Sequence, residues 1–195
     1  MVSTEQFVFL HLEKCAGTFI TKFLLEAFPG SDYEKGSAPL PFHPANKFVF
    51  GSIRNPWDWY VSLYHNTGGV QKKLPKGITF TDFVKNMCSK EGIWHDLDFA
   101  KMHQRDIGML SFRYFNTYKV FPDFICRVED LKAEIVRCFA SFDHPLSLKN
   151  KNLLNKMEKV NVGKRGNYRD YYTNETRDLV AHKDRMIINT YQYTF

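Results

Sequence analysis

The sequence predicts an α/β fold in which a central, mainly parallel sheet is covered by helices on both sides. Residues 7–12 are apolar and bounded by a loop, which is typical of a central parallel strand, and residues 47–53 ("KFVFGSI") have the pattern of a second strand. Each is followed by a stretch with the spacing of a helix. Because strands that alternate with helices form parallel sheets, the order of these stretches indicates a three-layer α/β architecture.

The expected elements follow one another along the whole chain. After the strand at 7–12, apolar residues share one face of a helix until Pro29-Gly30 stops it. The strand at 47–53 ends at Asn55-Pro56, because proline suits the first turn of a following helix. Thr173 is a candidate cap for the last helix, whose Thr176, Leu179, Val180, Lys183 and Ile187 share a face. The remaining expected elements are an aromatic helix at 57–64, helices at 81–90 and 98–109, a strand at 123–128 and a helix at 129–142.

Length and composition indicate one domain. The 195 residues are 44% hydrophobic and 16% aromatic, which suffices for one sizeable core, so we expect a single domain over residues 1–195. No run approaches the about 18 apolar residues of a membrane span, and the first residues lack a signal-peptide pattern. We therefore expect no membrane span and a cytoplasmic protein. The four cysteines lack CxxC spacing, which favours reduced thiols over a zinc site or a disulfide framework.

The loop after the first strand is a predicted phosphate site. Where a parallel strand passes into its helix, backbone N–H groups and the positive helix end meet at one spot. Gly17 allows close approach of the backbone, Thr18 adds a hydroxyl and Lys14 adds a mobile positive charge. The order of residues differs from the nucleotide loop G-x-x-x-x-G-K-[ST], since the lysine comes first.

A second predicted anion site follows the next strand. Arg54 stands at the end of that strand, and Ser62 comes eight residues later on the following helix. We expect both to converge on one anion, while an ion pair between Arg54 and Asp58 is the structural alternative. Two anion sites at neighbouring strand ends predict a ligand with two separate phosphates.

These two stretches resemble motifs of the sulfotransferases that use 3′-phosphoadenosine 5′-phosphosulfate (PAPS). The family patterns are H-x-P-K-T-x-G-T and R-[DN]-P-x-[DE]-x-x-x-S-x-Y, and here they read "HLEKCAGT" (11–18) and "RNPWDWYVSLY" (54–64). Residues 123–131 look like the third core strand of the family, and residues 161–180 resemble the carboxy-terminal signature of its carbohydrate-type branch. The chain departs from the patterns at Glu13, Cys15 and Trp59, where the family has proline, threonine and commonly arginine.

The resemblance implies a P-loop-like fold, a donor site and a reaction. Lys14 would stabilise the leaving phosphate during sulfuryl transfer, and Arg54 and Ser62 would bind the 3′-phosphate. Lys164 and Arg165 would close over that phosphate or the adenine. The product would be 3′-phosphoadenosine 5′-phosphate (PAP), and no metal is expected. The loop residues that would hold the 5′-phosphosulfate are Lys14, Cys15, Ala16, Gly17, Thr18 and Phe19.

A base must take the proton of the acceptor, and His43 is the first candidate. It lies in the loop before the second strand, where related members carry a histidine, and we expect this loop at the carboxyl edge of the sheet. Glu129 and Asp130 are second choices, and His11 is expected to be a packed side chain. The acceptor is expected to be a small molecule or a glycan, and the aromatic run at 112–121 is expected to be core.

Charge keeps two other classes of protein open. The segment 149–169 carries the excess that gives the chain a net charge of +6, and it is either a solvated loop or an anion-binding edge. A basic polyanion- or nucleic-acid-binding module would explain this charge and the aromatic content, although we expect no nucleic-acid partner. A P-loop-type nucleotide kinase would share the strand-loop-helix unit but lacks GK[ST] here.

Overall fold

The computed structural model describes residues 1–35, 40, 43–44, 46–65, 76–88, 106–158 and 165–195. Within these ranges, eight α-helices and a five-stranded sheet give the predicted α/β class. The chain divides into two compact units: unit 1 contains Met1–Arg54 and Phe115–Val162, and unit 2 contains Asn55–Tyr114 and Gly163–Phe195. The expectation of a single domain stays a prediction. None of the helices in the described ranges has the length and apolar character that crossing a bilayer requires.

The sheet of unit 1 is mixed rather than mainly parallel. Its strands are arranged in the order β3-β1-β2-β4-β5. The pairs β2–β4 and β4–β5 are parallel, whereas β1 is antiparallel to both β2 and β3. The parallel part is therefore the three strands for which the sequence carries a signal. The strand bounds are Val2–Ser3 (β1), Phe7–Phe9 (β2), Asp32–Tyr33 (β3), Phe48–Ile53 (β4) and Phe124–Arg127 (β5).

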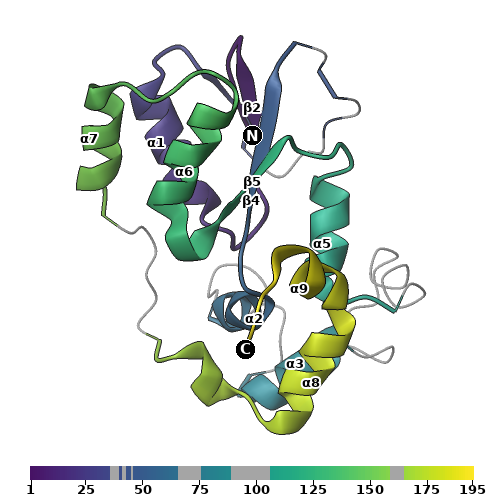
Figure 1. Cartoon of the computed structure of the whole chain (residues 1–195). Coiled ribbons are helices and arrows are strands. Elements are labelled where there is room, and N and C mark those ends of the chain that lie inside the picture. The colour runs from purple at the N-terminus through teal and green to yellow at the C-terminus, as the bar shows by residue number, and fades with distance from the viewer. Residues whose placement is uncertain (36–39, 41–42, 45, 66–75, 89–105, 159–164) are drawn as a thin grey trace. The chain divides into compact units, whose positions relative to one another are not determined.

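Three helices of unit 1 lie together on one side of the strands, as Figure 1 shows. They are α1 (Gly17–Ala27), α6 (Leu131–Ser141) and α7 (Leu148–Lys156). Phe7, Phe9 and Phe50 face this layer and join Phe139 of α6 in one aromatic core. Val8, between the two phenylalanines, is buried as well, so β2 is covered on both faces as predicted.

Tyr118 fixes the carboxyl half of β4. Its hydroxyl donates to the carbonyl of Ser52 at 2.7 Å and accepts from the amide of Ser52 at 2.8 Å. The ring lies where a Cβ of residue 51 would be, so only glycine fits at Gly51. This contact holds the end of β4 that leads to Arg54.

Unit 2 is built of helices and depends on a buried carboxylate. Asp184 is fully buried and accepts hydrogen bonds from the hydroxyl of Tyr60 at 2.9 Å and from Ser111. The amide of Ser111 is 2.8 Å away and its hydroxyl 2.7 Å. Because Ser111 is in the first turn of α5, Asp184 supplies that helix with a cap. The helices are α2 (Pro56–Tyr64), α3 (Phe80–Cys88), α5 (Met109–Thr117, shared with unit 1), α8 (Asn174–Lys183) and α9 (Arg185–Tyr191), with a 3₁₀ turn at Tyr168–Tyr171.

Several predicted elements have different bounds in the structure. Of the helix expected at 98–109, residues 98–105 lie outside the described residues. Residues 106–108 are not helical, and α5 begins at Met109. Thr173 caps the last helix as predicted, but this helix ends before Asp184 and α9 follows. The first strand ends at Phe9, a 3₁₀ turn at Val128–Asp130 precedes α6, and residues 89–90 of the helix expected at 81–90 lie outside the described residues.

Candidate anion-binding site

The loop between β2 and α1 has an unusual backbone. Lys14 and Ala16 have positive φ angles of 62° and 58°, a conformation that costs a residue other than glycine about 1–2 kcal/mol. Ala16, in the left-handed conformation, is followed directly by the right-handed first residue of α1. This change of backbone conformation turns successive N–H groups towards one point. The loop therefore has the backbone form of an anion-binding concavity.

The first turn of α1 directs its amides out of the helix. Ala16 is the N-cap residue and provides no side-chain cap, and the first intrahelical bond runs from the amide of Ile20 to the carbonyl of Ala16 at 3.1 Å. The amides before Ile20 have no partner within the helix, because the preceding turn does not exist. They belong to Gly17, Thr18 and Phe19, three residues of the predicted phosphate loop. The exposed hydroxyl of Thr18 stands beside them.

The neighbouring strand β4 holds this loop through its carbonyl groups. The hydroxyl of Ser52 donates to the carbonyl of Cys15 at 2.6 Å, and Nη1 of Arg54 donates to the carbonyl of Lys14 at 3.3 Å. Arg54 and the Lys14 loop therefore lie at the same carboxyl edge of the parallel strands, as the sequence predicts. Sequence reasoning missed Ser52, and its only signal is a polar residue within an apolar strand.

Cys15 contributes its backbone and not its thiol to this edge. The side chain is fully buried, and burial raises the pKa of the thiol above its ordinary value, while the positive charge of Arg54 opposes the shift. A buried, neutral thiol has little to offer a phosphate. The predicted part of Cys15 in donor binding is thus reduced to its main chain.

Glu129 reaches the same edge from the third parallel strand. It lies exposed in the 3₁₀ turn that follows β5, and its charge acts on the Cys15 thiol together with that of Arg54. The ends of β2, β4 and β5 thus bring together a lysine, an arginine and a carboxylate. Sequence analysis named Glu129 only as a second choice of base.

His43 itself lies at the opposite edge, so the expectation of the carboxyl edge is wrong for this residue. Its Nε2 contacts Oδ2 of Asp123 at 3.2 Å, and the same oxygen accepts from the amide of Val49 at 2.7 Å. Val49 is near the start of β4, and Asp123 immediately precedes β5. Arg54 comes five positions after Val49, which is roughly 16 Å along a strand. Asp123, far away in the sequence, draws the histidine to this place, and its role as base stays a prediction.

The other predicted ligands belong to unit 2 or lie outside the described residues. Ser62 is half-buried on α2. Arg165 places Nη2 2.8 Å from Oδ1 of Asp58 and Nη1 3.2 Å from its carbonyl oxygen, with 17% and 22% of the two side chains exposed. Asp58, proposed above as an alternative partner of Arg54, thus has Arg165 as an ion-pair partner. Lys164 lies outside the described residues, and the contacts of Ser62, Lys164 and Arg165 with a ligand stay predictions.

His11 is half-buried beside the loop and was expected to be a packed side chain of the first strand. Its ring stacks on Phe9 at a centroid distance of 6.3 Å, and a Cβ on Gly17 would overlap it. The close approach that the sequence assigns to Gly17 is therefore made, in this structure, by a side chain of the same unit.

The described ranges contain no group of three or more His, Cys, Asp or Glu side chains that could hold a metal ion. No protein-family model matches this chain, and no curated protein was found to match it.

Proposed function

We propose that the protein is a PAPS-dependent sulfotransferase that moves a sulfuryl group to a hydroxyl or amine of a small-molecule or glycan acceptor. The observation that carries the proposal is the loop from Lys14 to Phe19, whose carbonyls are bound by Ser52 and Arg54 and whose helix-terminal amides point outward. This arrangement suits an anion, and the order of its residues is the order of the sulfotransferase motif. A P-loop-like arrangement of three layers belongs to the same proposal.

The donor would be bound through both of its phosphate ends. The 5′-phosphosulfate would lie on the amides of Gly17, Thr18 and Phe19, with Lys14 beside its bridging oxygen. Arg54 would bind the 3′-phosphate, since a planar guanidinium presents N–H donors in a geometry that suits phosphate oxygens.

The transfer is a substitution at sulfur. The acceptor oxygen or nitrogen forms a bond to sulfur, the bond from sulfur to the 5′-phosphate oxygen breaks, and PAP leaves with that electron pair. Negative charge grows on the bridging oxygen, where the Lys14 ammonium stabilises it more in the transition state than in the bound donor. The proton of the acceptor passes to a base.

Glu129 suits the role of base better than His43. It lies at the carboxyl edge with Lys14 and Arg54, whereas His43 is held by Asp123 at the amino edge. A base has to come within hydrogen-bond distance of the acceptor, so position is the first criterion. The proposal therefore assigns proton removal to Glu129.

The three classes of function differ in the ligand that stabilises the fold. Thermal unfolding with PAP, ATP-Mg and a single-stranded oligonucleotide separates them. A sulfotransferase is stabilised most by PAP, and binding at a hundred times Kd adds about 2.7 kcal/mol. Greater stabilisation by ATP-Mg would support a kinase. Oligonucleotide binding with a steep salt dependence and no effect of PAP would support a polyanion-binding module.

A further inference from the structure

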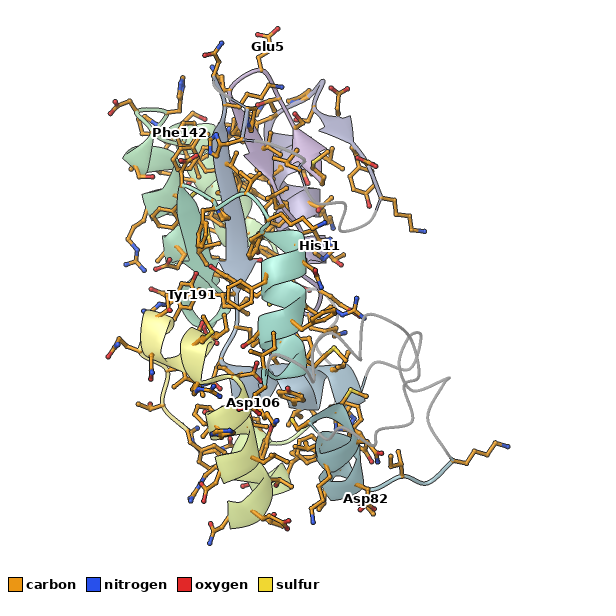
Figure 2. All side chains as sticks on the ribbon, turned by 90° about the vertical axis from the view of Figure 1, so that its right-hand side faces the viewer. Glu5, His11, Asp82, Asp106, Phe142 and Tyr191 are labelled. Atoms are coloured by element: carbon orange, nitrogen blue, oxygen red, sulfur yellow. The ribbon has the colours of Figure 1, made fainter. Side chains whose placement is uncertain are left out.

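His11 lies against the loop that the proposed function uses. In Figure 2 its label marks the segment that follows β2. The ring lies so close to Gly17 that a Cβ there would overlap its Cδ2 and Nε2 atoms. The imidazole also lies beside the Phe9 ring, with an angle of 20° between the ring planes. The ring is therefore part of the loop's surroundings.

The ring also lies at the end of α1 where an anion would bind. In a helix the Cα–Cβ bond tilts towards the N-terminus, and the free amides of the first turn point in that same direction. A group that lies at the Cβ position of the first helical residue, Gly17, is therefore beside the N-terminal end of α1. His11 and the amides of the first turn are thus at the same end of the helix.

The imidazole keeps its hydrogen-bonding capacity. Among the described residues, none is hydrogen-bonded to either ring nitrogen of His11. Neither nitrogen is fully enclosed, so both keep some contact with solvent. Burial lowers the pKa of His11 below its ordinary value, and the ammonium of Met1 adds to this shift. Phe9 and Gly17, the neighbours from β2 and α1, carry no charge. Without a ligand, the ring is thus a neutral imidazole near neutral pH.

We propose that His11 is a further ligand of the anion on the Lys14 loop, donating a hydrogen bond from its ring and binding most strongly in its protonated form. This rests on the proposed function only for the location of the anion. A dianion close to the ring favours imidazolium over imidazole. By linkage, whatever favours imidazolium in the complex also makes the anion bind more tightly as the pH falls. The site would bind its anion more tightly at acidic pH and release it more readily at higher pH.

Inorganic sulfate is the probe, because it stays a dianion across the pH range in which histidine titrates, whereas phosphates do not. Its Kd would be measured by thermal shift at pH 8.0 and pH 5.5 for the full chain and for His11→Gln, which cannot be protonated. We expect the wild type to bind sulfate about tenfold more tightly at pH 5.5, the effect of one unit of pKa, and His11→Gln to lose most of this gain. His144→Gln removes an exposed histidine of unit 1 and is the matched control.

A proton NMR titration of the wild type gives the same answer without any variant. Sulfate should raise the pKa of His11 by about one unit. An unchanged His11 titration, an equal pH dependence in His11→Gln, or no binding of sulfate at either pH would overturn the inference. If His11 responds to sulfate while PAP and AMP stabilise the protein equally, the inference stands and the sulfotransferase proposal fails. If PAP is preferred while His11 does not respond, the reverse holds.

Discussion

Ser52 of β4 donates its hydroxyl hydrogen to the carbonyl of Cys15, across 2.6 Å, in the loop that follows β2. Both residues are fully buried, so this bond is shielded from water. It joins the ends of two parallel strands and holds the loop in a conformation with two left-handed residues, Lys14 and Ala16. The shape of the candidate site therefore depends on a residue that would not itself touch the ligand.

Replacing Ser52 by alanine should destabilise unit 1 and loosen the loop. The buried carbonyl of Cys15 loses its donor, and an unsatisfied buried group costs about 1–3 kcal/mol. Urea unfolding measures the loss in free energy of unfolding, and the Kd for sulfate reports whether the loop still binds an anion. Ser141→Ala is the control, since that hydroxyl bonds within its own helix to the carbonyl of Cys138. Equal effects of the two substitutions would show that Ser52 does not hold the loop.

Replacing Lys14 by alanine should lower turnover more than it weakens PAP binding. Its charge is needed where negative charge develops on the leaving oxygen, and losing such a group costs on the order of 10²-fold in kcat. Single-turnover rates with PAPS and the Kd of PAP give the two values. Lys22→Ala, on the exposed face of α1, should change neither. A Lys14 variant that only raises the KM for the donor would make Lys14 a binding group.

The position of each candidate base predicts which substitution matters. Glu129→Gln should lower turnover by about 10²-fold or more, because proton transfer by a positioned side chain contributes that much. His43→Gln should leave it nearly unchanged, since Asp123 holds the ring at the amino edge. Neither variant should alter PAP binding by much. The opposite order of effects would return the role of base to His43.

Asp184 gives unit 2 a pH dependence of known sign. Burial raises the pKa of Asp184 above its ordinary value of 3.8, although Ser111 and Tyr60 oppose the shift. A carboxyl whose pKa is higher in the folded protein binds more protons there, so stability falls as the pH rises from about 3.8 through the folded value. Relative to Asp184→Asn, the wild type should lose stability over this interval. Urea unfolding from pH 4 to 6.5 measures the difference, with exposed Asp143→Asn as the control. A constant difference would contradict the buried-carboxylate account.

Local signals in the sequence predicted the elements on which the site is built. Pro29-Gly30 marks the end of α1, Asn55 caps α2, and Thr173 caps α8, each through chemistry contained within a few residues. The loop at Lys14 and the position of Arg54 follow from the same local pattern. These features could be predicted because their causes are adjacent in the sequence.

The features of the fold and of the site that the sequence did not predict depend on contacts between residues far apart in the chain. Strands β1 and β3 have two residues each, too few to show alternation. The start of α5 at Met109 is set by Asp184, 73 residues beyond the Ser111 that it binds, and His43 is held by Asp123, 80 residues further on. The bond from Ser52 to Cys15 joins residues 37 positions apart. A single sequence contains no signal for such pairs.

The preference for PAP over AMP tests the central claim most directly, because the two differ only in the 3′-phosphate. Calorimetry on the wild type should give a Kd for PAP that is at least about tenfold lower than the Kd for AMP. A charge-assisted contact usually contributes about 1.5 kcal/mol or more, which corresponds to this ratio. Arg54→Ala should remove most of this preference, and its affinity for AMP should fall much less than its affinity for PAP, because Arg54 also bonds to the Lys14 loop. Equal binding of PAP and AMP by the wild type would contradict the assignment of a donor with two separate phosphates.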